Sequence, residues 1–183
     1  MEKTPKAKES RLDWLLRLLG VRRDELSAVV WSGLYYFFLL AGYHVIRPIR
    51  DAMGLTGGVR ELKWLFMITL CVMLIVNPVF SAIVSRYPRR VFVPAVYLFF
   101  VANLAVFFVF FKLRDPQSDA MVARVFFVWG GVFSLLAVSV FWAMMADVFR
   151  PEQSHRLFGL IGLGGTVGAI VGAGSTTLLA QRL

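Results

Sequence analysis

The chain has 183 residues, of which 58% are hydrophobic and 17% are charged, and its formal net charge is +9. Soluble domains carry about 25% charged residues, so this composition predicts a single membrane domain. The aromatic residues lie inside apolar runs rather than among the bases, which argues against nucleic-acid binding, and the single cysteine, Cys71, excludes an intramolecular disulfide and a thiolate metal cluster.

Residues 1–26 form a basic N-terminal region. Its leucines with helical spacing are Leu12, Leu15, Leu16 and Leu19. Together with Trp14 they predict a short amphipathic helix that lies in the plane of the lipid headgroups. Asp24 or Ser27 is expected to cap the long helix that follows.

Five long apolar stretches fill the remaining region, residues 27–183. A helix of about 20 apolar residues crosses the hydrocarbon core of a bilayer, and a helix satisfies its own backbone groups there. The first stretch could continue to Asp51, and Pro78 predicts a kink in the second. The expected fold class is therefore an all-α membrane protein with about five transmembrane helices. The predicted spans are residues 27–47, 62–85, 91–111, 121–148 and 155–180.

Lysine and arginine residues near the span ends are more numerous on the side of the membrane that holds the N-terminus. Because such residues concentrate in cytoplasmic loops, we expect a cytoplasmic N-terminus. The lipid bilayer is then the first partner of the chain, and a bacterial inner membrane is the expected location.

The end of the first span carries a candidate site for an anionic solute. The residues that share one helical face there are Gly33, Tyr36, Leu40, Tyr43, Arg47 and Arg50. Arginine offers a planar fork of donors that suits phosphate oxygens. Alternatively, Arg47 and Arg50 reach the outer headgroups, with Arg47 paired to Asp51. The sequence leaves both interpretations open.

A second constellation joins two loops on the predicted cytoplasmic side. Arg86 and Arg89 follow the second span, while Asp147 and Glu152 flank the turn between the fourth and fifth spans. These groups could form a charge latch that breaks and re-forms as the helices tilt. Alternatively, the bases serve only as a topological anchor.

The fifth span contains a repeated glycine pattern. Gly164, Gly168 and Gly172 are four residues apart, which predicts close approach of another helix rather than a ligand site. The glycines match neither a dinucleotide-binding fingerprint nor a P-loop. A nucleophile with a plausible base and a metal-binding helix pattern are also missing from the sequence. We therefore expect neither an enzyme nor a cofactor.

Several segments resemble a known family of transporters. The basic turn Ser81–Arg90 resembles a degenerate form of the turn between helices two and three in the major facilitator superfamily. Three further segments resemble, in their order and spacing, the ATP/ADP translocase branch of that superfamily. They are Arg47–Asp51, Val140–Asp147 and Glu152–Gly165.

The resemblance implies a twelve-helix secondary transporter built from two six-helix halves, such as a nucleotide antiporter. This chain would supply an incomplete N-terminal half, and would need further helices or a second chain. Arg47 or Arg50, and Lys63, would act on the substrate. The branch has an acid in its fourth helix, where Trp129–Ser134 contains none. The alternative function is a small non-transporting scaffold that docks a partner through its glycine-rich fifth span.

Overall fold

The structure is a computed structural model that describes residues 14, 16, 18–113 and 120–180. This part of the chain contains five helices that are long and apolar enough to cross a membrane. The prediction of an all-α membrane protein with about five transmembrane helices is therefore confirmed. The helices are α2 (Leu26–Leu55), α3 (Val59–Arg86), α4 (Arg89–Leu113), α5 (Ala120–Val148) and α6 (Pro151–Ala180).

The helices extend beyond the apolar spans that predicted them. α2 continues through Pro48 to Leu55, because the charged residues in its last turns find partners on the protein. α3 likewise continues as one helix through Pro78. α6 begins at Pro151, since the fixed φ of proline suits the first position of a helix, where no backbone donor is needed.

The prediction of the N-terminal cap of α2 was wrong. Glu25 is the N-cap residue, and its side chain makes no capping hydrogen bond. The carboxylate instead binds Arg156 at the start of α6. The start of α2 is thus held by an ion pair with α6 rather than by the capping side chain of Asp24 or Ser27 that the sequence predicted.

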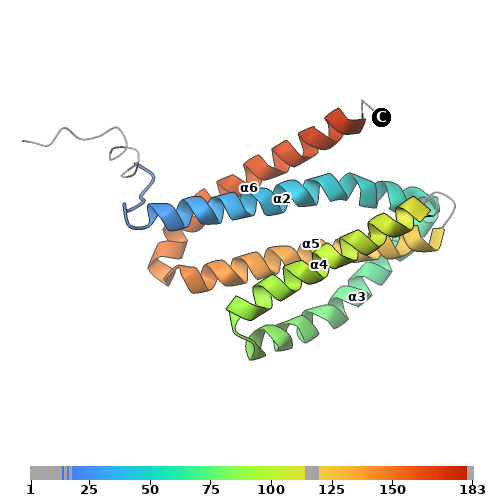
Figure 1. The fold of residues 1–183 in the computed structure, drawn as a ribbon, viewed down its shortest axis with the longest axis horizontal. Helices are drawn as coiled ribbons and strands as arrows, with labels where there is room; N and C mark the ends of the chain where they lie inside the picture. The colour runs from blue at the N-terminus through green and yellow to red at the C-terminus, as the bar shows by residue number, and fades with distance from the viewer. Residues whose placement is uncertain (1–13, 15, 17, 114–119, 181–183) are drawn as a thin grey trace, which may run out of the picture.

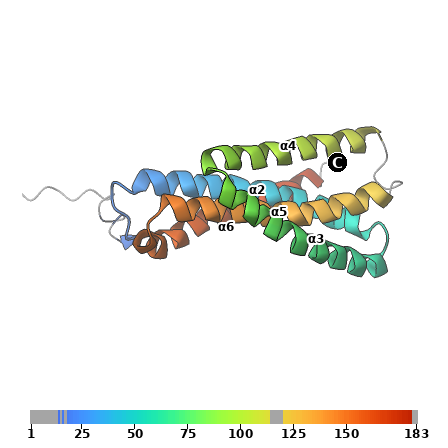
Figure 2. The same cartoon turned by 90° about the horizontal axis from the view of Figure 1, so that it is seen from below.

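α5 is the central helix of the bundle and packs against α2, α3 and α4. α2 and α6 lie side by side along the other part of the molecule, whereas α4 lies at an edge (Figures 1 and 2). α5 is apolar on all sides, as expected of a helix that is buried by neighbours. We call the end with the start of α2 the N-terminal end, and the opposite end the far end.

A compact apolar core lies at the N-terminal end. Leu16 and Val21 are buried there, whereas Trp14 and Leu18 are exposed. Leu12 and Leu15 lie outside the described residues, and the interfacial placement of this segment stays a prediction. The buried residues of the core are Leu16, Val21, Phe141, Met145, Phe149, Leu157 and Ile161.

Candidate functional site

Arg50 lies inside the bundle near the far end of α2. Its side chain is only 15% exposed, and its Nη2 lies 2.8 Å from Oδ1 of Asp51. The Nε of Arg50 also donates to that oxygen, at 3.1 Å. On the other side, Cζ of Arg50 lies 4.8 Å from the ring centroid of Phe127 on α5, a cation–π geometry. The guanidinium is therefore held between a carboxylate and an aromatic face.

Two glycines of α5 make room for this side chain. A Cβ atom on Gly130 would lie 2.9 Å from Cδ of Arg50, and one on Gly131 would lie 2.8 Å from Cγ2 of Thr69 on α3. Larger residues at these positions would push the arginine side chain or α3 away. The Gly130-Gly131 pair, noted in the sequence only for its lack of an acid, thus lets Arg50 lie against α5.

The other residues predicted at this site are spread along α2 and α3. Arg47 is 53% exposed, and its Nε lies 3.7 Å from Oδ2 of Asp51. Lys63 is exposed near the start of α3. The structure thus brings Arg47 and Arg50 together around Asp51 and leaves Lys63 at the far-end surface.

Of the two tyrosines predicted at the site, Tyr36 lies far from Arg50 along α2. Tyr36 stacks on Phe141, with ring centroids 4.3 Å apart and planes 10° apart. It lies fourteen residues before Arg50, a rise of about 21 Å along the helix. Tyr43 meets His44 edge to face at 5.1 Å. A shared helical face therefore does not by itself bring Tyr36 next to Arg50, whereas a role for Tyr43 stays a prediction.

The glycines of α6 lie against the backbone of α2. A Cβ atom on Gly164, Gly168 or Gly172 would collide with a carbonyl oxygen of α2. These oxygens belong to Gly33, Phe37 and Ala41, which are also four residues apart. The face that the sequence offered for helix packing is thus covered by a helix of the same chain.

One ion pair joins α4 to α5 at the N-terminal end. Nε of Arg89 lies 2.5 Å from Oδ2 of Asp147, with side-chain exposures of 34% and 51%. Arg86 and Glu152 are both exposed, and among the described residues no salt bridge involves either one. The geometry thus brings one of the predicted acid–base pairs together.

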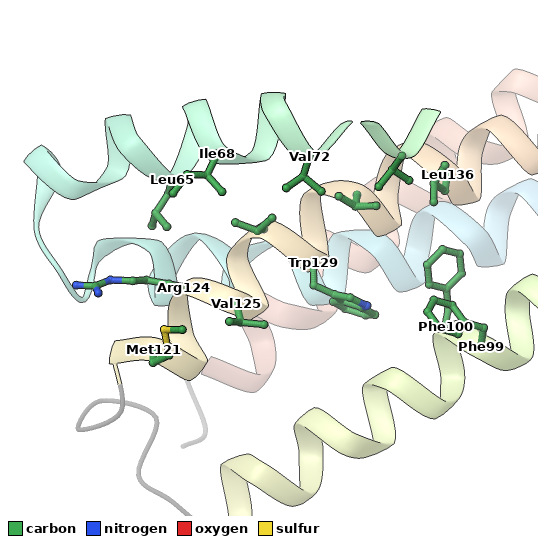
Figure 3. A pocket seen from close by; sticks show the side chains of 13 residues that line it. Leu65, Ile68, Val72, Phe99, Phe100, Met121, Arg124, Val125, Trp129 and Leu136 are labelled. Atoms are coloured by element: carbon green, nitrogen blue, oxygen red, sulfur yellow. The ribbon is translucent and has the colours of Figure 1, made fainter. Parts of the chain in front are cut away.

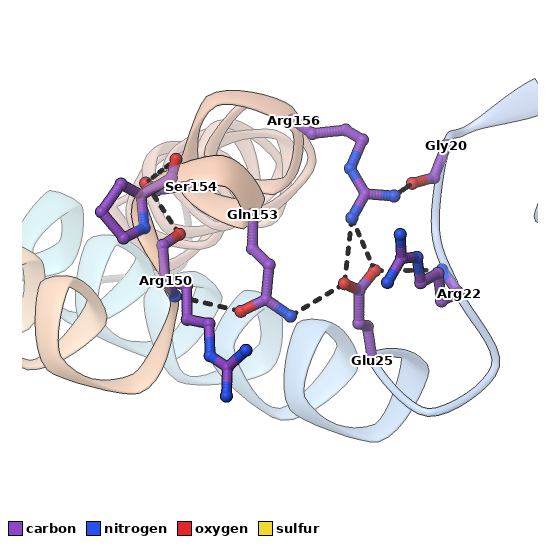
Figure 4. A network of polar contacts seen from close by, with 8 residues as sticks. Gly20, Arg22, Glu25, Arg150, Gln153, Ser154 and Arg156 are labelled. Atoms are coloured by element: carbon purple, nitrogen blue, oxygen red, sulfur yellow. Dashed lines mark hydrogen bonds and ion pairs between the residues drawn. The ribbon is translucent and has the colours of Figure 1, made fainter.

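A polar network that the sequence analysis missed ties the start of α2 to the start of α6 (Figure 4). Glu25 is 4% exposed, and its two oxygens accept from Nη2 of Arg156 at 2.9 and 3.0 Å. Gln153 donates to Glu25 at 2.8 Å, and the backbone N–H of Arg22 donates at 3.1 Å. Arg156 also donates to the carbonyl of Gly20. The sequence did contain a signal for this network, because Gln153 and Arg156 are three residues apart and therefore share one face of a helix.

This network changes the acidity of Glu25. Burial acts to raise the pKa of its carboxyl, but the hydrogen bonds from Gln153 and the Arg22 backbone, with the charge of Arg156, outweigh that effect. The pKa of Glu25 therefore lies below its ordinary value, and the carboxylate form is the one that the fold stabilises.

A second missed contact lies within the membrane-spanning part. The hydroxyl of Tyr35 on α2 donates to the hydroxyl of Tyr97 on α4. Tyr97 in turn lies 3.5 Å from the carbonyl of Ala137 on α5. The sequence signal for this contact was a tyrosine inside an apolar run, because a buried phenol hydroxyl needs a hydrogen-bond partner. This contact links α4 to the rest of the bundle.

Among the described residues, no group of three or more histidine, cysteine, aspartate or glutamate side chains could hold a metal ion. The mostly buried Arg50, with its partners Asp51 and Phe127, offers ionic and hydrogen-bonding recognition.

Comparison with known proteins agrees with this architecture. A sequence model of the Major Facilitator Superfamily matches residues 2–183. The chain belongs to the Major Facilitator Superfamily. No curated protein and no solved structure matches the chain. The predicted superfamily is thus confirmed, and the chain is a facilitator-type membrane protein of a transporter family.

Proposed function

We propose that this facilitator provides N-terminal helices of a secondary transporter for nucleotides or another organic anion, with Arg50 as the anion-recognising group. The observation that carries the proposal is the 15% exposure of the Arg50 side chain within an apolar bundle. Charged residues at membrane depth are costly and usually face a cavity or a partner. A guanidinium kept there suits recognition of carboxylate or phosphate.

Asp51 serves as the resident counter-ion of Arg50 in this proposal. It is 46% exposed, so it can exchange Arg50 for water without a large desolvation cost. An anionic solute then competes with Asp51 for the guanidinium, while the more exposed Arg47 attracts the solute to the site. Lys63 adds positive charge at the same end of the bundle, and Tyr36 packs on Phe141 rather than binding the solute.

We propose nucleotides as the first solutes to test, because three segments of the sequence resemble ATP/ADP translocases; the family match itself is to the superfamily. The limit of this resemblance is the Trp129–Ser134 segment, which contains no acid. Gly130 and Gly131 leave space for the Arg50 side chain there, and Asp51 is the acid that pairs with it among the described residues. A site with this charge balance favours anions of several kinds. A nucleotide antiporter is one kind of transporter that would use such a site.

A complete transporter of this kind moves one helical bundle against another. We therefore propose that the chain works together with further helices or a second chain, in a bacterial inner membrane with its N-terminus in the cytoplasm. The contact between Arg89 and Asp147 supports the proposed cytoplasmic latch. The scaffold alternative gains no support, because α2 already covers the glycine face of α6.

The test replaces Arg50 by glutamine and measures uptake of labelled nucleotides and other organic anions into vesicles. The chain is reconstituted alone and with the further helices that we propose. Losing a hydrogen bond to a charged group costs about 1.5–3 kcal/mol, so we expect the apparent affinity to fall about tenfold or more. Arg50→Lys keeps the positive charge but loses the planar fork of donors. We expect its apparent affinity to lie between those of the parent chain and of Arg50→Gln.

Arg60→Gln is the matched control, since Arg60 is an exposed arginine at the same end of the bundle. It is expected to leave uptake unchanged. Unchanged uptake of every transported anion after replacement of both Arg47 and Arg50 by glutamine would contradict the proposal.

A further inference from the structure

The arginines at the far end of the bundle differ in how deeply they are buried. Arg47 and Arg124 are about half exposed, although each is paired with an acid. Arg50 is mostly buried, yet its own acid, Asp51, is also about half exposed. Long cationic side chains tend to extend toward the membrane surface, where the charge stays in water. Pairing with a half-exposed acid therefore does not by itself explain why Arg50 stays inside the bundle.

The aromatic ring of Phe127 distinguishes Arg50 from these two arginines. Cζ of Arg50 lies 4.8 Å from the centroid of this ring, whereas neither Arg47 nor Arg124 lies over an aromatic ring of the described residues. A ring attracts a cation through the negative potential of its face, and the attraction is stronger where water is absent. The ring of Phe127 is buried, so it can hold the guanidinium within the bundle.

Neighbours on α2 and α3 fix the position of the Phe127 ring. A Cβ atom on Gly54 of α2 would lie 2.5 Å from Cδ2 of Phe127, so the backbone of α2 packs directly on the ring. Phe66 of α3 meets the ring edge to face, with the two centroids 5.3 Å apart. The ring therefore cannot follow the Arg50 side chain when that side chain moves, and it acts as a fixed support.

α5 also carries a buried ring that has no cation over it. An apolar groove of about 560 Å³ lies between α3, α4 and α5, and Phe100 and Trp129 line it, whereas Arg50 and Phe127 do not (Figure 3). Phe126 is buried and stacks on Trp129 with centroids 5.8 Å apart. Among the described residues no cation lies over the ring of Phe126. Phe126 is therefore a matched control for Phe127 on the same helix.

We propose that Phe127 is a positioning residue of the anion site, whose ring keeps the Arg50 guanidinium inside the bundle while Asp51 is exchanged for the transported solute. The inference rests on the proposed function, because it concerns the same guanidinium. Once Asp51 has let go, an unsupported arginine would extend toward the far-end surface. The ring has no charge and no hydrogen-bonding atom, so it holds the cation without neutralising it or occupying its N–H donors. The planar fork of donors thus stays available to the solute.

The first test measures the coupling between the ring and the guanidinium, and it needs no transport. Phenylalanine with one, two or three fluorine atoms replaces Phe127 in the full chain, in the parent and in Arg50→Gln. Fluorine withdraws electrons from the ring face and weakens its attraction for a cation, while the ring size changes little. In the parent we expect the equilibrium constant for unfolding in mixed micelles to rise stepwise, by about two- to thirtyfold over the series. In Arg50→Gln we expect no such rise, because the partner is absent.

The second test measures uptake of labelled anions by the same fluorinated chains, reconstituted with the further helices. We expect KM to rise stepwise along the Phe127 series by a similar factor, because the solute must then bring Arg50 back into place. The maximal rate should stay near that of the parent. The same series at Phe126 should leave KM unchanged, since that ring supports packing only.

Three outcomes overturn the positioning role of Phe127. In the first, fluorination at Phe127 changes unfolding equally in the parent and in Arg50→Gln, or not at all, so that the ring and the guanidinium are not coupled. In the second, the series at Phe126 raises KM as much as the series at Phe127. In the third, KM stays flat along the Phe127 series although Arg50→Gln lowers the apparent affinity, which leaves the proposed function standing. Unchanged uptake in Arg50→Gln instead contradicts the proposed function and this inference together.

Discussion

α6 meets α2 backbone to backbone, whereas α4 meets α5 through aromatic rings. On the α2–α6 side, three glycines leave no space for even a methyl group. On the α4–α5 side, rings such as Phe100 and Phe133 touch at a centroid distance of 4.8 Å, and the groove remains beside them. Small residues let two helices share a long contact, while large rings hold helices apart and leave spaces between them.

The difference also separates the polar contacts of the two sides. The α2–α6 side ends in the buried network of Glu25, Arg156 and Gln153. The α4–α5 side ends in the half-exposed pair of Arg89 and Asp147. Lipid offers no hydrophobic force between helices, so packing and polar contacts decide how firmly each helix is held. We therefore expect α4 to be held more weakly than α6.

The largest effect is expected where the two backbones touch. Gly168→Ala places a methyl group against the carbonyl of Phe37, and overpacking of this kind costs about 1–3 kcal/mol. Gly174→Ala is the matched control, because a Cβ atom there meets nothing within 4 Å. Alanine also favours the helix there by up to about 1 kcal/mol. Unfolding in mixed detergent micelles measures both, and equal losses would break the comparison of the two sides.

A smaller and pH-dependent effect is expected at Glu25. Its pKa is lowered in the fold, so its contribution to stability is fully present above its unfolded pKa. The contribution is lost as the pH falls through the folded value. Glu25→Gln should lower the free energy of unfolding at neutral pH and flatten its decrease in acid. The measurement is unfolding at several pH values between neutral and about 3, below the unfolded carboxyl pKa of about 4.3.

Glu152→Gln provides the control, since Glu152 is an exposed carboxylate at the same end. It should keep the acid dependence of the parent chain. If both variants show the same pH profile as the parent, the Glu25 network does not stabilise the α2–α6 side.

The smallest effect is expected at the Arg89–Asp147 pair. Half-exposed ion pairs contribute about 0–1 kcal/mol, and salt screens them further. A double-mutant cycle with Arg89→Gln and Asp147→Asn, measured at low and high salt, gives the coupling free energy. A coupling larger than that of Glu25 with Arg156 in the same cycle design would reverse the expected order of the two sides.

Much of this architecture follows from the sequence, because lipid imposes a simple rule. Apolar stretches of about 20 residues must form helices when no water can bind their backbone. The same rule explains why the five helices and the all-α class were predictable. The spacing of Gly164, Gly168 and Gly172 also indicated a face for close packing, since a helix places every fourth residue on one side.

The tertiary structure decided which residues meet across the bundle. Tyr36 and Arg50 share a face of α2, but one stacks on Phe141 and the other lies over Phe127. The partner of Glu25 lies 131 residues away, at Arg156. Periodicity along one helix fixes the direction of a side chain only relative to that helix, whereas its partner depends on which helix packs there. For this reason the network at Glu25, the Tyr35–Tyr97 contact and the groove at Trp129 emerge only once the five helices are assembled.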